Sequence, residues 1–342
     1  MKACRIVNPR LAESFEIPDP VAQSGEATIE IRRIGLCGTD LKTYLGTNPI
    51  VTYPRVIGHE IGAVLEHDAE IGGRHFPEGT VVTVNPYTVC GKCPSCRANR
   101  PNACRENQTL GNQRDGAARE RLAIAVDRIV PVSDLSVDQA ACIEPLSVGF
   151  HAVRRAEVRR EDTVLIIGAG MIGLGVVAGC AARGARTIVA DLSDAKLATA
   201  KKLGATITLN VRNRSLVDDV HALTDGDGPD VVIEAVGTVK TYQDAVTAAA
   251  FSGRVVYIGY AADDVAFATK LFVMKELDIR GSRNATMEDF HHVAEEIRRG
   301  TIKVEEIITH RFPIDDIDKA LRTWAGKADE VTKILVEVNS HR

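Results

Sequence analysis

The sequence predicts a two-domain protein of the α/β plus β class, in which a mostly β region is combined with a doubly wound parallel sheet. Its 342 residues exceed the length of one typical domain, which is about 100–200 residues. Up to about residue 150, short β-type segments are separated by Gly and Pro. Beyond about residue 160, strand and helix patterns alternate, and this order is typical of a parallel sheet with helices on both faces.

Three segments of the first region combine β-branched and aliphatic residues between turn residues, and we expect them to form strands. They are ATIEIRRIGL (27–36), GAVLEH (62–67) and GTVVTVNP (79–86). The chain after about residue 284 predicts a helix over 286–299 and two further strands, ITHRFP and TKILVEV. This last part can fold back on the first region.

The second region opens with TVLIIG (163–168), a short apolar run that predicts a buried strand, and a helical pattern follows over 171–184. TIVAD (187–191) predicts a second strand, and a second helix is expected to end at about residue 203. Four more strands are expected at TITLN (206–210), VVIEAVG (231–237), RVVYIG (254–259) and LDIRG (277–281).

The charge balance argues against a nucleic-acid or membrane partner. The chain carries 42 basic and 46 acidic side chains, and only 4% of its residues are aromatic. This composition offers no basic surface for phosphate backbones or lipid headgroups. No apolar stretch has the length of a membrane span, and the N-terminal MKACRIVNPR lacks the apolar run of a secretory signal. Because the eight cysteines follow a metal-type pattern rather than a disulfide framework, we expect a cytoplasmic protein.

Half of the eight cysteines lie close together, at Cys90, Cys93, Cys96 and Cys104. The spacing C-x2-C-x2-C-x7-C brings four thiolates within reach of one ion, and tetrahedral zinc prefers such a set. An iron–sulfur cluster uses the same ligand type, and four unrelated cysteines are the plain alternative. Since thiolates would fill all four positions of a zinc ion, the loop is expected to be structural. A zinc ribbon that binds nucleic acid or protein is a different function class that the same loop allows.

Gly168-Ala-Gly170-Met171-Ile172-Gly173 is a GxGxxG motif that joins an expected strand to an expected helix. The first Gly permits a tight turn, the second lets the backbone approach a pyrophosphate, and the third lets the helix pack on the sheet. The helix N-terminus adds N–H donors for an anion. In this context the motif predicts a dinucleotide site, and an ordinary strand–helix turn is the alternative.

Asp191 ends the second strand of this region, downstream of Gly173. A carboxylate at this point would bind the adenosine ribose hydroxyls and repel a 2′-phosphate, which favours NAD over NADP. Arg186 and Lys196 leave NADP open, and a helix-capping Asp is the plain alternative. Further cofactor contacts are expected where two later strands end, at Val236, Gly237, Ile258 and Gly259.

A second group of candidate metal ligands is spread along the first region. Cys37 follows an expected strand, His59 and Glu60 are adjacent, and Glu144 precedes a proline. A catalytic zinc takes three protein ligands and keeps one position for water or substrate, and thiolate, imidazole and carboxylate suit it. Taken singly, each residue is also explained as a buried Cys, a packed His or a surface Glu. Spacing alone cannot bring them together.

With these motifs the chain resembles the zinc-dependent medium-chain dehydrogenase/reductase family, which includes alcohol, sorbitol and threonine dehydrogenases. GHE at 58–60, the cysteine loop at 90–104 and GAGMIG at 168–173 have the order and distances of that family, and the resemblance runs from end to end. Four segments refine it. IEPLSVG (143–149) is similar to the sorbitol branch, and YPRVIGHE (53–60), HAVRRA (151–156) and GSRNATMEDF (281–290) look like bacterial sugar-acid dehydrogenases of the L-galactonate 5-dehydrogenase type.

The resemblance implies a GroES-like β-barrel catalytic domain, built from both ends of the chain, with a Rossmann NAD-binding domain inserted between them. Members of the family are dimers or tetramers, so a homo-oligomer is expected. The implied boundaries are 1–148 with 284–342 for the catalytic domain, 88–106 for its structural zinc lobe, and 149–283 for the NAD-binding domain.

The resemblance also assigns the chemistry. It implies that Cys37, His59 and Glu60 bind a catalytic zinc, with Glu144 on or beside the metal. The zinc would polarise a substrate hydroxyl and lower its pKa. A hydride would then pass from the substrate to the nicotinamide ring of NAD. The cysteine loop would hold a second, structural zinc.

Several single positions qualify this assignment. By resemblance, Thr39 supplies the hydroxyl that begins the proton exit. The family usually has His three residues later, where this chain has Lys42, and an ammonium of pKa about 10.4 needs burial to act as a base. A solvated Lys42 is the alternative. Ala63 stands where Gly is usual, and its methyl group is tolerable unless φ is positive. Arg283 and Asn284 are candidates for binding an anionic substrate group or the cofactor, because guanidinium binds carboxylate in a bidentate manner.

The leading interpretation is a zinc- and NAD-dependent oxidoreductase that converts a secondary alcohol of a small polyol or sugar acid to a ketone. The alternatives within this class are L-threonine 3-dehydrogenase-like and simple alcohol dehydrogenase activity. A zinc-free reductase of the same fold is another class, but it would lack the Cys37, His59 and Glu60 set. Of the remaining Cys and His residues, Cys4, Cys142 and Cys180 are expected in the core and His291 and His292 on the surface.

Overall fold

The computed structural model describes residues 1–339, which divide into two compact units. The first unit ends at Pro145 rather than at residue 148, because α3 (Val137–Arg155) is one continuous helix and no loop marks the boundary. The chain leaves the second unit after Ala285, where residue 283 was the expected limit. The units are Met1–Pro145, Thr286–Arg298 and the chain from Ile307 for the first, and Leu146–Ala285 with Arg299–Glu306 for the second.

The short segment Arg299–Glu306 is a correction to the expected boundaries, since it groups with the second unit and not with the first. Ile302 and Val304 of this segment are buried. Glu306 also forms an ion pair with Lys202 of the second unit, at 2.6 Å. These contacts explain why the segment belongs there.

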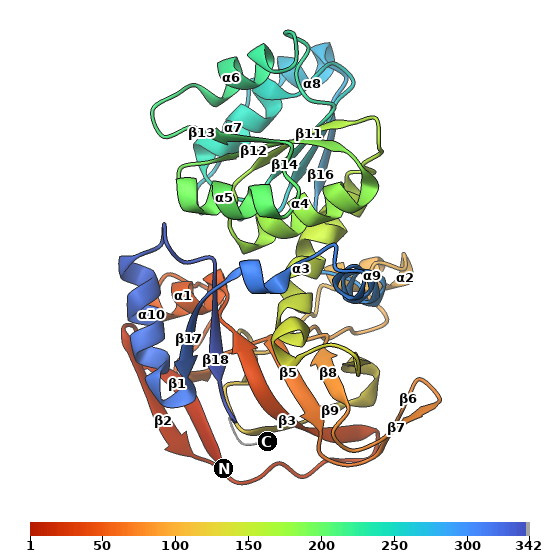
Figure 1. The fold of residues 1–342 in the computed structure, drawn as a ribbon, viewed down its shortest axis with the longest axis vertical. Coiled ribbons are helices and arrows are strands. Elements are labelled where there is room, and N and C mark those ends of the chain that lie inside the picture. Colours follow the sequence, from red (N-terminus) through yellow and green to blue (C-terminus); the bar gives the residue numbers. More distant parts are fainter. Residues whose placement is uncertain (340–342) are drawn as a thin grey trace. The chain divides into compact units, whose positions relative to one another are not determined.

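A seven-stranded sheet forms the centre of the first unit. Its order is β10-β8-β5-β3-β18-β17, and β9 also pairs with β3. β18 runs antiparallel to β3 with Leu335 opposite Gly35, so that the last part of the chain lies in the same sheet as the first part (Figure 1). Ile29, Ile31 and Ile34 of β3 are fully buried in the core of this unit. The strands are β3 (Glu26–Gly35), β5 (Glu60–Leu65), β8 (Val81–Val84), β9 (Arg121–Ala125), β10 (Ile129–Pro131), β17 (Ile308–Pro313) and β18 (Lys333–Glu337).

Two smaller sheets and several helices complete the first unit. Ile317, Ala320 and Leu321 of α10 are buried at helical spacing, which gives this helix an apolar stripe. The small sheets contain β2 (Leu11–Glu16), β1 (Lys2–Asn8) and β4 (Arg55–Val56), and β6 (Ala69–Ile71) with β7 (Arg74–Phe76). The helices are α1 (Gly38–Leu45), α2 (Pro94–Arg97), α9 (Met287–Arg298) and α10 (Ile317–Gly326), with 3-10 turns at Pro101–Ala103, Val126–Arg128 and Ile314–Asp316.

The second unit is built on a six-stranded sheet of order β13-β12-β11-β14-β15-β16, and every neighbouring pair in it is parallel. This is the 3-2-1-4-5-6 order of doubly wound dinucleotide-binding sheets. Val164, Ile166 and Val232 are fully buried, as expected for strands covered on both faces. The strands are β11 (Thr163–Ile167), β12 (Arg186–Asp191), β13 (Ile207–Asn210), β14 (Val231–Glu234), β15 (Arg254–Tyr257) and β16 (Asp278–Gly281).

Helices cover both faces of this sheet. α4 and α5 lie on one face, and α6, α7 and α8 lie on the other (Figure 1). Ser193 and Ser215 cap α5 and α6, because their hydroxyl oxygens accept the N–H of Lys196 and Asp218. The helices are α4 (Met171–Arg183), α5 (Asp194–Lys202), α6 (Leu216–Ala222), α7 (Val239–Ala248) and α8 (Lys270–Met274), with a 3-10 turn at Val304–Glu306.

The parallel sheet and its alternating helices confirm the predicted fold class. Several strand limits differ from expectation, and two of these differences bear on the candidate sites. β14 ends at Glu234 because the side chain of Glu234 accepts the N–H groups of Val236 and Gly237, which turns the chain away from the ladder. β5 begins earlier than expected, at Glu60, so that this carboxylate lies on a strand rather than in a loop.

Candidate functional site

Two neighbouring strands of the first unit carry three candidate metal ligands. Cys37 follows β3 and is the N-cap residue of α1, whereas His59 and Glu60 lie at the start of β5. β3 and β5 are antiparallel, with Gly35 opposite Glu60. The Cys37 sulfur, a His59 ring nitrogen and a Glu60 carboxylate oxygen all lie within 4.8 Å of one another. The fold therefore brings together three residues that spacing along the chain could not connect.

Asp40 fixes the two segments that present these ligands. Its buried carboxylate accepts the N–H of Cys37 at 2.8 Å and the N–H of Gly58 at 3.4 Å. Burial raises the pKa of Asp40, whereas the neighbouring His59 lowers it, and the net direction is upward. The capping-box spacing between Cys37 and Asp40 is the one sequence signal that points to this residue.

Glu60 is held by a cation from the other end of the chain. The Lys333 ammonium on β18 donates to Glu60 Oε2 at 2.5 Å and to the Leu36 carbonyl at 3.0 Å, and the side chains of Lys333 and Glu60 are each 1% exposed. Burial lowers the pKa of Lys333, but the negative charge of Glu60 outweighs it and raises the pKa. The Glu60 side chain also needs Gly35, since a Cβ at that position would lie 1.9 Å from Glu60 Oε2.

Glu144 lies near the three ligands but outside the set within 4.8 Å. It is buried on α3, directly before Pro145, and its Oε1 accepts a short hydrogen bond from the Tyr87 hydroxyl. Burial raises the pKa of Glu144 to about 6, with His59 and Glu60 acting in opposite directions on it. In this arrangement Glu144 is a neighbour of the ligand set rather than a member of it.

The cluster as a whole is suited to a cation. Cys37, Asp40, Glu60 and Glu144 outnumber the single buried ammonium of Lys333. Burial lowers the pKa of His59, but the charges of Cys37, Asp40 and Glu144 raise it well above its ordinary value. The His59 Nδ1 is buried and has no hydrogen-bond partner among the described residues. A thiolate, an imidazole and a carboxylate with excess negative charge are the donor set that zinc prefers.

The four cysteines of the loop also converge. Cys93 is the N-cap residue of α2, Cys96 lies in that helix, and Cys104 ends the following 3-10 turn. Their sulfurs and that of Cys90 lie within 4.8 Å of one another. The Ser95 hydroxyl and nearby backbone N–H groups lower the pKa of Cys93 to about 5, which favours a thiolate. These four residues can hold a tetrahedral ion with no position left open.

The glycine motif of the second unit has the geometry that a pyrophosphate needs. Gly168 has a φ of +99°, and a Cβ there would lie 2.7 Å from Val236. A Cβ on Gly173 would lie 1.9 Å from the Gly168 carbonyl oxygen. At Gly170, which is the N-cap residue of α4, nothing lies within 4 Å of such a Cβ. Thus the outer glycines are required by packing, and the middle one leaves open space at the helix N-terminus, beside Met171 and Ile172.

Asp191 lies at the carboxyl end of β12, next to this loop. One carboxylate oxygen accepts the N–H of Ala169 at 2.7 Å and the other accepts the N–H of Ser193 at 2.9 Å. The carboxylate is half-buried and keeps lone pairs for further donors. These bonds fix a negative charge where ribose hydroxyls are bound in doubly wound sheets.

Glu234 orders the remaining predicted cofactor segments. It is fully buried and accepts the N–H of Val236 at 2.8 Å, the N–H of Gly237 at 2.7 Å and the hydroxyl of Thr241 at 2.8 Å. Its second oxygen would lie 2.8 Å from a Cβ on Gly259, the residue after Ile258. The two strand ends therefore meet at one buried carboxylate, which sequence reasoning had not assigned a role.

The other predicted positions lie as follows. Lys42 is exposed on α1. Ala63 is fully buried in β5 and is not among the residues with positive φ, so its methyl group is accommodated. Arg283 and Asn284 are half-buried in the second unit, between β16 and α9, whereas the Cys37 cluster belongs to the first. The structure therefore does not bring these two residues to the cluster within one unit.

The unassigned cysteines and the adjacent histidines differ sharply in environment. Cys4, Cys142 and Cys180 are buried, and burial raises the pKa of each thiol to about 12. They remain protonated and unreactive at neutral pH. His291 is exposed on α9, and His292 lies 3.9 Å from Glu296 on the same helix.

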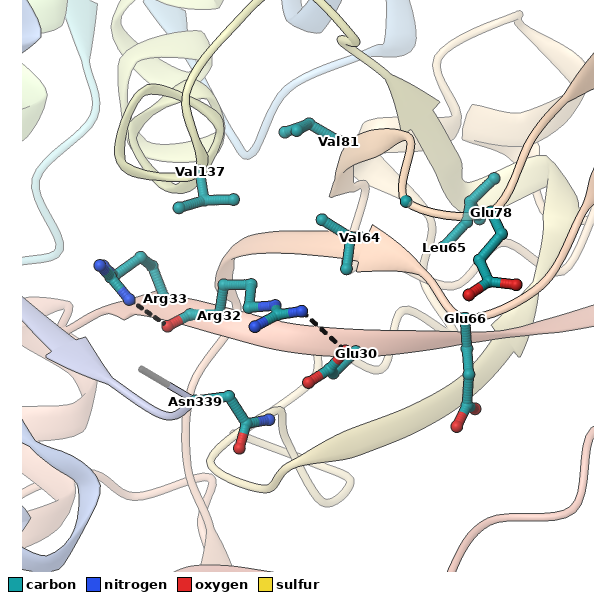
Figure 2. Close-up of a pocket in the computed structure, with 11 residues that line it drawn as sticks. Glu30, Arg32, Arg33, Val64, Leu65, Glu66, Glu78, Val81, Val137 and Asn339 are labelled. Carbon is teal, nitrogen blue, oxygen red and sulfur yellow. Dashed lines mark hydrogen bonds and ion pairs between the residues drawn. The ribbon is translucent and has the colours of Figure 1, made fainter. Parts of the chain in front are cut away.

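A cavity of about 600 Å³ on the first unit is separate from the cluster (Figure 2). It lies over β3 and β5, and both of its arginines already have partners. Arg32 donates to Glu30 at 2.9 Å, and Arg33 donates to the Arg32 carbonyl at 2.9 Å and to Asp138 at 2.8 Å. None of its lining residues is a cysteine or a histidine. This cavity therefore lacks the thiolate and imidazole ligands that the Cys37 cluster offers.

Comparison with known proteins identifies the family. Residues 23–134 match the family described as alcohol dehydrogenase GroES-like domain, and residues 172–299 match zinc-binding dehydrogenase. L-galactonate-5-dehydrogenase of Escherichia coli is 35% identical over 298 residues, which cover 86% of each chain. L-threonine 3-dehydrogenase of Pseudoalteromonas atlantica is 31% identical over 319 residues, 91% of this chain and 93% of that one.

The fold is shared as well. A crystal structure of the alcohol dehydrogenase RspB from E. coli, complexed with the cofactor NADH, has a TM-score of 0.90 at 29% identity and covers 99% of both chains. Within residues 1–339, no helix combines the length and apolar character needed to cross a membrane. The family description names zinc, and zinc is therefore the metal that the comparisons support for this chain. The chain is a member of the zinc-type alcohol dehydrogenase family, with a GroES-like domain and a Rossmann domain, and is an oxidoreductase that acts on CH–OH groups.

Proposed function

We propose that this protein oxidises a secondary alcohol of a polyol or sugar acid, of the L-galactonate kind, to a ketone with NAD as hydride acceptor. The observation that carries the proposal is the buried set of Cys37, His59 and Glu60, because three ligands leave one position of a zinc ion for the substrate hydroxyl. The 35% identity to L-galactonate-5-dehydrogenase supports the substrate class.

The residues around the set have separate tasks. Cys37, His59 and Glu60 would hold the metal, which supplies Lewis-acid polarisation of the substrate hydroxyl when bound. Thr39 Oγ1 is buried without a hydrogen-bond partner among the described residues, so it is free to accept a hydrogen bond from the substrate hydroxyl. Lys42 is exposed on α1, so we assign it no part in the proton path.

The second unit would bind the dinucleotide, which supplies the hydride-accepting ring. The pyrophosphate would lie at the α4 N-terminus, in the open space at Gly170. Asp191 would accept hydrogen bonds from the adenosine ribose and repel the 2′-phosphate of NADP. We therefore infer a preference for NAD.

The four-cysteine loop would hold a second zinc with a structural role. Thiolates fill its four positions, which leaves none for substrate. Zinc there would close the short turns between Cys90 and Cys104, which contain only one-turn helices. Reduced thiols are required for this, in agreement with a cytoplasmic location.

We also propose a homo-oligomer. β16 is the last strand in the order of the parallel sheet and pairs only with β15 among the described strands. Ile279 of β16 and Val273 and Met274 of α8 are exposed large hydrophobic residues, at 40%, 82% and 62%. An unpaired edge next to exposed apolar side chains favours pairing with a second copy. Such pairing is compatible with a dimer and with a tetramer.

A substrate panel tests the proposed function. We expect NAD reduction to be fastest, in kcat/KM, with an aldonate or a hexitol, and to stop when a chelator has removed the metal. The panel also contains L-threonine and simple secondary alcohols, since a threonine dehydrogenase is 31% identical. Arg283 and Asn284 remain candidates for a substrate carboxylate, and an aldonate preference would support that role. A clear preference for L-threonine would replace the sugar-acid assignment.

A further inference from the structure

Resting on the proposed zinc site, we propose that Tyr87 is a positioning residue that holds Glu144 away from the metal ligand set, so that the fourth metal position remains open. Glu144 is a buried carboxylate close enough to act on His59 and Glu60 electrostatically, yet it stands outside the set within 4.8 Å. A carboxylate is itself a good zinc ligand. A structural restraint must therefore keep Glu144 out of the ligand set while Glu60 belongs to it.

The two carboxylates are restrained by different groups. Glu60 is paired with the Lys333 ammonium and lies on β5, directly in the strand that presents the ligands. Glu144 instead accepts the Tyr87 hydroxyl, and this is a short, charge-assisted hydrogen bond when the carboxylate is ionised. The hydrogen bond engages one oxygen of Glu144 and fixes the direction of its side chain, so Glu144 would have to give up this bond to turn toward a cation in the ligand set.

The backbone of Tyr87 is itself held on both sides. Its N–H donates to Asn85 Oδ1 at 3.1 Å, and its carbonyl accepts from Arg128 at 3.2 Å. The preceding carbonyl, of Pro86, accepts the N–H of Leu110 at 3.2 Å. The tyrosine side chain is 4% exposed. It is therefore a fixed donor rather than a mobile side chain that happens to reach Glu144.

The helix around Glu144 restrains this residue less than the surrounding loop restrains Tyr87. Pro145 follows directly inside α3 and has no N–H, so one bond of the helical ladder is missing at this point. Beyond its hydrogen bond to Tyr87, the Glu144 side chain forms no other hydrogen bond with the described residues. Removal of the phenol hydroxyl should therefore allow Glu144 to turn to the metal and fill the fourth position.

The test uses Tyr87→Phe in the full-length protein with Co²⁺ in place of zinc at the catalytic site. Imidazole reports an open metal position by changing the visible spectrum of Co²⁺. We expect the wild type to bind imidazole and Tyr87→Phe to need about 10–100-fold more of it, the range usual for loss of an outer-shell partner. The double variant Tyr87→Phe/Glu144→Gln should bind imidazole as the wild type does, since an amide is a poor ligand.

Tyr44→Phe is the matched control. Tyr44 is also a buried tyrosine whose hydroxyl donates to a carboxylate, that of Asp318 at 3.0 Å, but Asp318 is not in the cluster. This variant should bind imidazole with wild-type affinity. Unchanged imidazole binding in Tyr87→Phe, or a loss that Glu144→Gln does not reverse, would overturn the role of Tyr87. Failure of the wild type to bind any metal at the cluster would instead overturn the proposed zinc site.

Discussion

The contact between Lys333 and Glu60 shows how much of the site depends on one long-range pair. The two residues are separated by 273 positions, and both side chains are 1% exposed. Removing two charges from water is costly, and it is offset only by their mutual attraction and by further hydrogen bonds such as the one to the Leu36 carbonyl. Lys333 also sets the charge next to the metal ligands, so it affects both stability and chemistry.

In the metal-free protein, Lys333→Met should lower the free energy of unfolding by about 3–5 kcal/mol, because it leaves the Glu60 carboxylate buried without a partner. Urea denaturation at neutral pH measures this change. Lys327→Met is the control, since Lys327 pairs with Glu330 on the exposed surface and such pairs contribute about 0–1 kcal/mol. Equal stabilities for the two variants would show that the buried pair does not have the assigned role.

For single residues, the sequence points to the candidate ligands more readily than to the residues that position them. Cys37, His59 and Glu60 belong to short motifs that the family resemblance connects. Tyr87 and Lys333 belong to no such motif. Tyr87 is a loop residue, and Lys333 lies in an otherwise apolar strand, where the sequence gives no sign of a special role. Their partners are 57 and 273 residues away, and no local rule links positions so far apart.

Among the elements, the glycine loop between β11 and α4 shows most clearly which positions require glycine. Gly168 and Gly173 are needed for packing, since a Cβ at either would lie within 3 Å of its neighbours. Gly170 is different, because its φ of −69° suits any residue and its surroundings are empty. A pyrophosphate in this space, as proposed above, would account for the absence of a side chain at Gly170.

Gly170→Ala should therefore leave the thermal stability close to that of the wild type and weaken NAD binding about tenfold or more, a change of about 1.4 kcal/mol. Gly173→Ala should instead destabilise the fold by about 1–3 kcal/mol, since its Cβ would lie 1.9 Å from the Gly168 carbonyl oxygen. Thermal unfolding and NAD titration separate the two effects. Full NAD affinity in Gly170→Ala would contradict the assigned pyrophosphate position.

The elements of the second unit were largely predictable, because buried parallel strands and amphipathic helices alternate with short loops. The elements of the first unit were less predictable from the sequence. β1 and β2 are absent from the expected strands, and α3 was not expected as a helix. Pro145 and Gly149 lie inside α3 and normally argue against a helix. Gly149 is required there, since a Cβ would lie 2.5 Å from the backbone of Gly175 in α4.

For the whole molecule, the two proposed cofactor sites belong to different units. The Cys37 cluster lies in the first unit and the glycine loop in the second. The domain limits were only approximately predictable, since α3 passes through the boundary and Arg299–Glu306 returns to the second unit. Since each site is built within its own unit, loss of one ligand should not abolish binding of the other. Turnover, in contrast, requires both.

Zinc analysis combined with NAD turnover in the wild type and in Cys37→Ala tests the central claim most directly. We predict about two zinc ions per wild-type chain and about one in the variant, in which the four-cysteine loop remains intact. NAD affinity should be unchanged, whereas alcohol oxidation should be lost. Two zinc ions in Cys37→Ala, or turnover that survives in this variant, would contradict the assignment of the catalytic metal to Cys37, His59 and Glu60.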